Sequence, residues 1–307
     1  MKQFSNKAIV AFIIVLSTIS VYSQTAGNSG LSFLKFGFGA RNISMGDAGT
    51  ALSNDLTSLF YNPAKLVFTD ESEVMFMHNE WIQDASSEVI GVKTEFWDIP
   101  FAIGLNVTSV GEIELREIPS EEPLSTFDAN YFFGSISTGF LISEEISFGV
   151  GIKYLYEGML DNEASGFGFD FGVHYQLPYK GLTASTVLKN IGSMNEFRNE
   201  STKLPTEFRI GTAYTYDIES SKLDCTGGIE YQKYFGSDVN HLNFGAEVLY
   251  NKLIAARAGY QTGYESESRG FTAGIGLMWG NLKFDYAFLP FSTGLGSANL
   301  FSLQFKF

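Results

Sequence analysis

Cysteine is almost absent from this 307-residue sequence, which contains only Cys225. A single cysteine forms no intrachain disulfide and no cysteine-based metal site, so hydrogen bonding and packing must stabilise the fold. Charge is also sparse, at 18% of residues, and it is mostly acidic. With 20 Lys and Arg against 34 Asp and Glu, the formal net charge is −14. Such a chain is poorly suited to bind a polyanion, which argues against nucleic acid as a partner.

Long apolar runs are missing as well, except near the N-terminus. There, Lys2 and Lys7 precede or flank the run Ala8–Leu16, and small residues follow it. We predict a signal peptide over residues 1–23, with cleavage before Gln24 and export from the cytoplasm. An N-terminal membrane anchor is the alternative, but the run is shorter than the roughly 20 residues that span a bilayer as a helix. If the protein lies in a membrane, it must cross with strands.

Aromatic residues and glycine are abundant, with 29 Phe, 15 Tyr and 32 Gly. In "GFGFDFGVHYQ", residues 166–176, apolar side chains alternate with glycine and polar residues. A period of two indicates a strand with one apolar face. The same alternation recurs through most of the chain after residue 73 and predicts an all-β fold.

A soluble β-sandwich would also alternate, with its apolar face turned inward. Two features favour a transmembrane, antiparallel up-and-down β-barrel instead. Many strands run to about ten residues, the length that crosses a bilayer when tilted. The polar faces are rich in glycine and carry only isolated charges, which suits a confined interior. The polar residues expected to face this lumen are Lys153, Asp170, His174, Arg209, Glu247, Arg257, Lys283 and Asp285.

The pattern predicts about fourteen strands, an even number as bacterial outer-membrane barrels have. They lie near residues 74–82, 87–97, 100–109, 130–141, 145–156, 165–177, 181–190, 206–217, 222–234, 241–250, 252–263, 270–279, 281–289 and 297–307. Tight connections alternate with mostly longer ones at 110–129, 157–164, 191–205, 235–240, 264–269 and 290–296. Short periplasmic turns opposite long outer loops are typical of outer-membrane barrels.

The last predicted strand, "ANLFSLQFKF", ends the sequence on Phe307. Its alternating aromatic face resembles the C-terminal signal by which bacterial outer-membrane barrels are recognised for assembly. We therefore expect Phe307 to act in outer-membrane targeting and the protein to be integral to the outer membrane of a Gram-negative bacterium. An ordinary edge strand with an aromatic end is the alternative.

Residues 24–73 precede the first predicted strand and differ from the rest of the chain. Ser53 or Asn54 can cap a short helix that runs through Phe60, and Pro63 can open a second turn over 64–68. A compact segment of this size suits the interior of a barrel. We predict three parts: a signal peptide (1–23), a hatch (24–73) and a transmembrane barrel (74–307). A loose periplasmic leader is the alternative reading of the second part.

The stretch "GARNISMGDAGTALSNDLTSLFYNPAKLVF", residues 39–68, resembles the N-terminal signature of the PorV/PorQ family of outer-membrane proteins, which are related to the FadL channels. The match rests on Gly39, Ala40, Arg41, Met45, Gly46, Asp47, Ala48, Gly49, Asp55, Ser58, Asn62, Pro63 and Ala64. The resemblance implies a fourteen-stranded FadL-like barrel with an N-terminal hatch. It also implies a role in type IX secretion, in which PorV takes cargo from the translocon to the surface attachment machinery.

Two other functions stay open. A FadL-like channel would take up hydrophobic small molecules through a lateral opening, for which Gly259 and Gly263 are candidate kink positions. An outer-membrane enzyme would need a clustered nucleophile and histidine, and no Gly-x-Ser-x-Gly, His-Glu-x-x-His or phosphate-loop motif is present. We interpret His174 and Asp170 as parts of a lumenal hydrogen-bond network. We expect no catalysis, no cofactor and no metal.

The predicted loop 110–129 is strongly acidic. Its acids are Glu112, Glu114, Glu117, Glu121, Glu122 and Asp128, against the single base Arg116. Such a loop can contact lipopolysaccharide through divalent ions, or it can dock a partner protein. The expected partners are therefore membrane lipids and lipopolysaccharide, together with secretion-system or cargo proteins.

Overall fold

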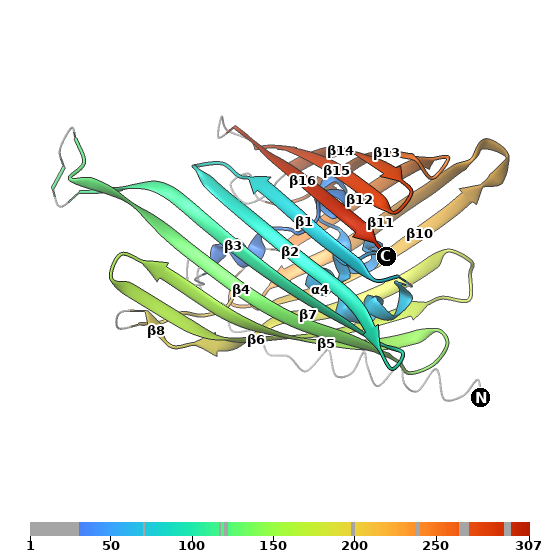
Figure 1. Cartoon of the computed structure of the whole chain (residues 1–307), viewed down its shortest axis with the longest axis horizontal. Helices are drawn as coiled ribbons and strands as arrows, with labels where there is room; N and C mark the ends of the chain where they lie inside the picture. Colours follow the sequence, from blue (N-terminus) through green and yellow to red (C-terminus); the bar gives the residue numbers. More distant parts are fainter. Residues whose placement is uncertain are drawn as a thin grey trace.

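The computed structural model describes residues 31–69, 71–116, 118–119, 122–197, 200–237, 240–263, 270–291 and 296–307. Fourteen antiparallel strands in these ranges close into one barrel. The first strand, β1 (Glu73–Glu80), pairs with the last, β16 (Ser297–Lys306), which completes the closure. A closed sheet has no unpaired edge, as the hydrocarbon of a bilayer requires. The predicted fourteen-stranded up-and-down barrel is confirmed (Figure 1).

Every predicted barrel strand is present, with ends that differ by a few residues in most cases. The remaining barrel strands are β2 (Ala85–Phe96), β3 (Ile99–Leu115), β4 (Ser125–Leu141), β5 (Ile146–Met159), β6 (Asn162–Gln176), β7 (Leu182–Met194), β10 (Glu207–Ile218), β11 (Leu223–Tyr234), β12 (Asn240–Tyr250), β13 (Ile254–Gln261), β14 (Gly270–Trp279) and β15 (Leu282–Pro290). A one-turn 3-10 helix, η3 (Glu219–Ser221), joins β10 to β11.

The largest difference concerns the predicted loop 110–129, most of which is strand. Both β3 and β4 are 17 residues long, and they continue past their neighbours as a hairpin. A second predicted loop, 191–205, contains a small two-stranded sheet of β8 (Glu196–Phe197) and β9 (Glu200–Ser201). Glu117 and Glu121 of the acidic loop lie outside the described residues, as does the predicted signal peptide.

Tight turns join the strands at one end of the barrel. Trp97 and Asp98 link β2 to β3 with φ values of 52° and 60°, and Asn251 and Lys252 follow β12 with 52° and 54°. Positive φ at both central residues is what a type I′ hairpin turn requires. This short-turn end is the periplasmic end in outer-membrane barrels, and the long hairpins lie at the opposite, outer end.

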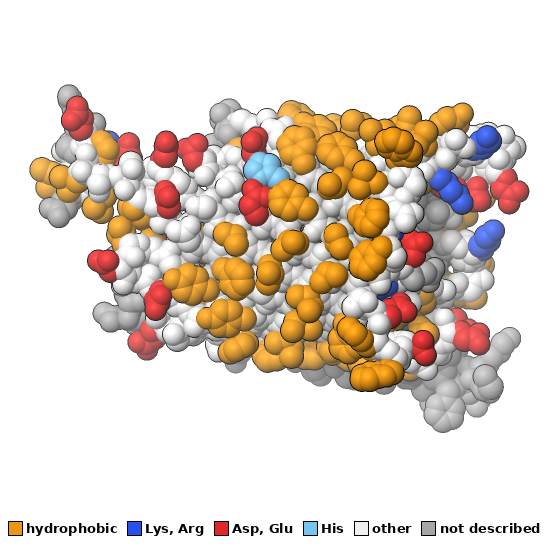
Figure 2. Space-filling model, in the orientation of Figure 1, with side chains coloured by type: hydrophobic (Ala, Val, Ile, Leu, Met, Phe, Trp, Pro, Cys, Tyr) orange, Lys and Arg blue, Asp and Glu red, His pale blue; other side chains and the backbone are white. Residues whose placement is uncertain are grey.

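The outer wall is apolar. Phe76, Ile90 and Ile152 lie on outward-facing positions of their strands and are half exposed. Figure 2 shows the hydrophobic side chains gathered in a band over the visible face, with charged side chains concentrated toward the two ends. At the short-turn end, Trp97 and Trp279 are 93% and 82% exposed. An apolar band bounded by aromatic residues is the surface that a bilayer solvates. No helix in the described ranges is both long and apolar enough to cross a membrane.

Residues 31–69, which we call the lumenal segment, lie inside the barrel and are drawn in blue in Figure 1. The segment contains η1 (Ser32–Lys35), α2 (Ala40–Ser44), α3 (Gly49–Leu52), α4 (Ser58–Tyr61) and η2 (Pro63–Phe68). Helix α2 packs against β13 to β16, α3 against β7, β10 and β11, and η2 against β3 to β6. The segment therefore contacts the wall on several sides of the lumen.

The helix predicted to run from Ser53 or Asn54 through Phe60 is shorter than expected, since only Ser58–Phe60 of that range are helical. Helix α3 ends at Leu52, and α4 begins only at Ser58. Between them, the backbone N–H of Thr57 donates to Asp55 Oδ1 at 3.0 Å, and that of Ser58 to the carbonyl of Asp55 at 3.0 Å, so the chain turns at Asp55 before it enters α4. The second predicted turn is present as η2, which begins at Pro63.

Candidate functional site: the filled lumen

Glycines line the inner wall where the lumenal segment comes closest. A Cβ at Gly149 of β5 would collide with the backbone of Pro63 and Ala64. Gly259 of β13 lies in the same way against Met45 and Gly46. Glycine within a strand permits this close approach of a second backbone. The glycine-rich inner face thus provides the space that the lumenal segment fills.

The interpretation of Gly259 as a kink is wrong. Strand β13 pairs without interruption with both β12 and β14, and Gly263 lies beyond its end at Gln261. Within the described strands, register shifts lie between Val110 and Ile113 and between Phe169 and Phe171.

A continuous chain of ion pairs joins the lumenal segment to three wall strands. Arg41 of α2 binds Glu247 of β12 through two hydrogen bonds, of 2.9 and 2.7 Å. Glu247 also accepts from Arg257 of β13 at 2.5 Å, and Arg257 donates to Asp285 of β15 at 2.8 Å. These four side chains are buried, and each charge faces an opposite one, which buried ions require.

The chain of ion pairs returns to the lumenal segment through Lys283. Its ammonium lies 3.3 Å from Asp285 and 2.8 Å from Asp55. Burial alone would raise the pKa of Asp55, but the charges of Lys283 and Arg41 hold it well below its usual range. The network balances three bases with three acids, so it needs no external counter-ion.

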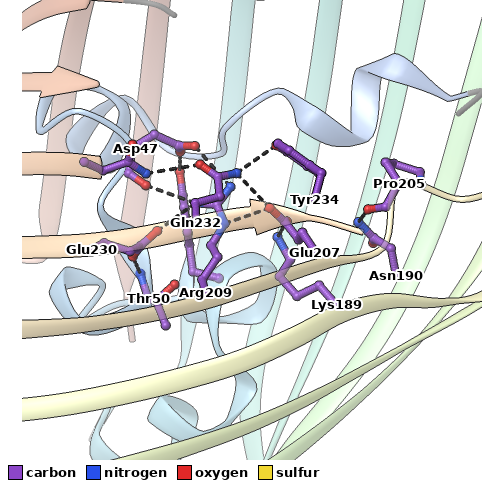
Figure 3. Close-up of polar contacts among 12 residues, drawn as sticks. Asp47, Thr50, Lys189, Asn190, Pro205, Glu207, Arg209, Glu230, Gln232 and Tyr234 are labelled. Atoms are coloured by element: carbon purple, nitrogen blue, oxygen red, sulfur yellow. Dashed lines mark hydrogen bonds and ion pairs between the residues drawn. The ribbon is translucent and has the colours of Figure 1, made fainter. Parts of the chain in front are cut away.

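A second buried network surrounds Arg209 of β10, as Figure 3 shows. Arg209 contacts Glu207 at 2.9 Å, Glu230 at 3.1 Å and Asp47 of the lumenal segment at 3.3 Å. Lys189 of β7 approaches the other oxygen of Glu207 at 2.8 Å. Since Arg209 presents several donors in a fixed planar arrangement, one side chain can hold three carboxylates.

The Arg209 network extends within the lumenal segment through Tyr61. Its hydroxyl donates to Asp47 Oδ1 at 2.5 Å and accepts from the backbone N–H of Phe38 at 3.1 Å. The backbone N–H of Thr50 donates to Glu230 at 2.8 Å. The ring of Tyr61 also covers Gly49, where any side chain would strike it. The network therefore fixes both the fold of the segment and its place on the wall.

Asn62, Pro63 and Ala64 form the start of η2. The side chain of Asn62 accepts from the backbone N–H of Ala64 at 3.1 Å, and Pro63 occupies a first-turn position where its missing N–H costs nothing. The amide of Asn62 also donates to the carbonyls of Val173 and Thr186 on β6 and β7, at 3.2 and 3.4 Å. The Asn-Pro-Ala motif thus anchors the segment to the wall.

Lys65, in the same helix, is buried without a carboxylate partner in any described contact. Its ammonium donates to the carbonyl of Ala51 at 2.6 Å. Burial lowers its pKa to about 7, assisted by the positive charge of Arg41. Lys65 is therefore the least well compensated base among these lumenal residues.

The Lys153–Asp170 pair stabilises an irregularity in the wall. The two side chains lie 2.7 Å apart, and both bind Asn190, whose φ of 57° marks the register shift between β6 and β7. His174 does not contact Asp170. It is hydrogen-bonded to Ser185 at 2.7 Å and lies against the ring of Phe68. His174 and Asp170 therefore do not form a catalytic dyad.

An apolar cluster fills the lumen toward the outer end. Phe33 and Phe38 of the lumenal segment pack on Phe133 of β4, with ring centroids 6.1 and 5.5 Å apart. Leu204, from the connection between β7 and β10, belongs to the same cluster. The first described residues therefore lie beneath the outer loops, where they occupy apolar space.

The structure places the eight predicted lumenal residues on the inner face, seven of them buried and Lys283 partly so. It brings seven of them into ion pairs, while His174 is hydrogen-bonded to Ser185. The functional role of each residue stays a prediction. Sequence reasoning named Arg41 only as a signature position, and it missed Tyr61, Lys189, Glu207 and Glu230. Glu207 had a detectable signal, since it lies two residues from Arg209 and hence on the same face of the strand.

Phe307 follows β16 at the short-turn end, where its side chain is exposed beside Phe305. Its backbone N–H donates to the carbonyl of Ser72, next to the first strand. This position is compatible with the predicted targeting role, which stays a prediction. Among the described residues there is no cluster of three or more His, Cys, Asp and Glu side chains placed to hold a metal ion.

The closed fourteen-stranded barrel with a helical segment in its lumen defines a FadL-like outer-membrane protein. The structure is similar to that of the Ralstonia pickettii toluene transporter TbuX, with a TM-score of 0.63 at 13% identity over 88% of this chain and 98% of that one. It is also similar to the Pseudomonas putida toluene transporter TodX, with a TM-score of 0.65 at 12% identity, over 88% of this chain and 99% of that one. A Pseudomonas aeruginosa FadL homologue is similar with a TM-score of 0.52 at 12% identity, over 94% of this chain and 98% of that one.

The family can be named from the sequence itself. The family model described as type IX secretion system protein PorV matches residues 22–236, so the chain belongs to the PorV family. This confirms the resemblance drawn from residues 39–68. No curated protein matches the sequence. The fold is therefore that of an outer-membrane β-barrel, and the family is PorV.

Proposed function

We propose that this barrel acts in type IX protein secretion, where it binds exported cargo or a translocon component. The observation that carries the proposal is the filled lumen. The lumenal segment is ion-paired to the wall through Arg41 and Asp55 on one side and through Asp47 on another. A barrel occupied in this way is poorly suited to conduct solutes, and its outer loops and outer wall stay available for partners. Membership of the PorV family supports this role.

The proposal assigns a part to each region of the chain. Residues 1–23 direct export, residues 24–73 form a hatch that keeps the barrel closed, and residues 74–307 form the transmembrane barrel. The signature positions Met45, Gly46 and Asp47 serve the hatch directly. Gly46 has a φ of 68° and lies against β12 and β13, while Asp47 binds Arg209.

Affinity purification from detergent-solubilised outer membranes tests this function. The tagged full-length chain should recover type IX translocon components or secreted cargo, quantified by mass spectrometry against an unrelated tagged barrel. A variant without residues 39–68 should lose these partners, because the lumenal segment shares an apolar cluster with Leu204 of the outer connection between β7 and β10. Recovery of no secretion component with the full-length chain, or equal recovery with the variant, would count against the proposal.

Uptake of a hydrophobic small molecule is the second candidate. The apolar cluster of Phe33, Phe38 and Phe133 beneath the outer loops favours it, as does the similarity to two toluene transporters. Growth on long-chain lipids, or their uptake, should then fall when the gene is removed and recover when it is restored. Equal growth with and without the gene would exclude this role.

A further inference from the structure

The β3–β4 hairpin extends beyond every strand that could pair with it. On one side, β2 pairs with β3 only as far as Val110, opposite Ala85. On the other, β5 pairs with β4 only as far as Ala129, opposite Met159. Residues 111–115 and 125–128 therefore form a two-stranded ribbon, which we call the outer ribbon, and no described strand pairs with either of its outer sides (Figure 1).

The outer ribbon has two unlike faces. Ile113 pairs with Phe127, which lies on the same face of β4 as the buried, lumen-facing Ala129. Leu115 shares this apolar face. The opposite face carries Glu114, paired with Thr126, and Asp128. The apolar face continues the inner wall outward, while the acidic face continues the outer wall.

The two edges of the ribbon are not equally open. A register shift at Gly111 and Glu112 interrupts the β3 edge, and the N–H of Gly111 is already used by the carbonyl of Asp84 at 3.2 Å. Bulges of this kind blunt an edge against further pairing. The β4 edge, Ser125–Asp128, pairs regularly with β3. Neither lysine nor proline occurs among the ribbon residues 111–115 and 125–128. An exposed, regular edge in water is a template for strand addition.

Charge selects the kind of strand that fits. Glu112, Glu114 and Asp128 are exposed on the ribbon, and Arg116, the residue that follows its first strand, is bound to Glu114 at 2.9 Å. Beside the β4 edge, Asp128 also lines a pocket of about 350 Å3 together with Asp161 of the β5–β6 turn and Glu163 at the start of β6. A strand with basic side chains on one face and apolar ones on the other would match both faces of the ribbon.

We propose that the β4 edge at Ser125–Asp128 is a docking site for an extended, basic segment of an exported protein, which adds to the outer ribbon as a third strand. This inference rests on the proposed secretion function and names the chemistry of its partner. Main-chain hydrogen bonds along the edge supply affinity, and the acidic face with the adjoining pocket selects lysine or arginine. Apolar side chains at alternate positions of the added strand lie on the apolar face of the ribbon, with Ile113 and Phe127.

Binding of short synthetic peptides to the full chain in detergent micelles tests the site. The probe is a fluorescent peptide in which Lys and Val alternate, and anisotropy reports its binding. The comparison peptide has the same sequence with alternate amides methylated, so it keeps its charge but cannot form a ladder. Loss of several hydrogen bonds should weaken binding by at least about tenfold. Equal binding of the methylated peptide would overturn strand addition.

Two variants locate the site. In the first, residues 111–128 are replaced by Asn-Gly, which joins the facing residues Val110 and Ala129 through a two-residue turn and leaves all β2 and β5 pairing intact. This variant should no longer bind the Lys-Val peptide. In the second, Glu112→Gln with Asp128→Asn should weaken binding, whereas the control Glu144→Gln with Glu145→Gln, at the short-turn end, should not. Unchanged binding by the ribbon-less variant would overturn the proposal.

Two further outcomes separate this inference from its alternatives. If purified lipopolysaccharide displaces the peptide in a magnesium-dependent manner, the ribbon is a lipid contact and the inference is wrong. If the full-length chain recovers secretion components while the peptide fails to bind, only this inference fails, and the proposed function stands. If the peptide binds and no secretion component is recovered, the proposed function fails and the exported-protein partner fails with it.

Discussion

Asp55 of the lumenal segment and Lys283 of β15 form a buried ion pair, with 2.8 Å between Oδ2 and Nζ. The two residues are separated by 228 positions in sequence. They belong to a neutral network of ion pairs that begins at Arg41 and ends at Asp55, both in the lumenal segment. Its other members, which include Glu247, lie on the barrel wall. The segment is thus held by electrostatic interactions that exist only in the closed barrel.

The coupling between Asp55 and Lys283 can be measured directly. Asp55→Asn, Lys283→Met and the double variant should give a coupling energy of about 1–3 kcal/mol in reversible urea unfolding from micelles, because the pair is shielded from water. The control is the exposed pair Glu71–Lys306, 2.9 Å apart, for which we expect less than about 1 kcal/mol. Equal coupling in the two pairs would contradict a buried network.

Close approach of the segment to the wall predicts an effect of added volume. Gly149→Ala places a methyl group against the backbone of Pro63 and Ala64 and should destabilise the fold by about 1–3 kcal/mol. Gly227→Ala on β11 is the matched control, since a Cβ there meets only the carbonyl of Gly245, at 3.8 Å. Thermal unfolding followed by gel mobility compares the two. If both tolerate alanine equally, the segment does not lie against Gly149.

Lys65 predicts a pH dependence of stability. Its pKa is about 7 in the folded protein against 10.5 for an ordinary lysine, so between these values the unfolded chain binds more protons. Stability should therefore rise as pH increases from about 7 to 10.5. Lys65→Met removes this contribution and should flatten the dependence over that range. Parallel pH profiles of the two proteins, measured by thermal unfolding, would show that burial does not lower the pKa of Lys65.

The barrel could be predicted from sequence because one property repeats along every strand. Outward positions such as Phe76 and Ile152 must meet lipid, and the period of two is visible in each segment independently. The lumenal contacts have no such local signal. Arg41 and Glu247 are 206 positions apart, and only barrel closure brings them together. The length of the β3–β4 hairpin was missed because its acidic outer face resembles a solvated loop.

The helical part of the segment shows the same limit. Pro63 predicts the start of η2 because its ring fixes the local backbone. The expected cap at Ser53 or Asn54 failed because the carboxylate of Asp55 competes for the nearby N–H of Thr57. The glycine-rich polar faces were predicted to line the interior, but only the structure shows that a second backbone lies against Gly149 and Gly259.

The filled lumen is tested most directly by single-channel conductance in planar bilayers. The full-length chain should remain closed, and a variant without residues 39–68 should conduct through a stable open pore, with refolding of each barrel checked by its heat-dependent gel mobility. A full-length chain that conducts as well as the folded deletion variant would contradict the account.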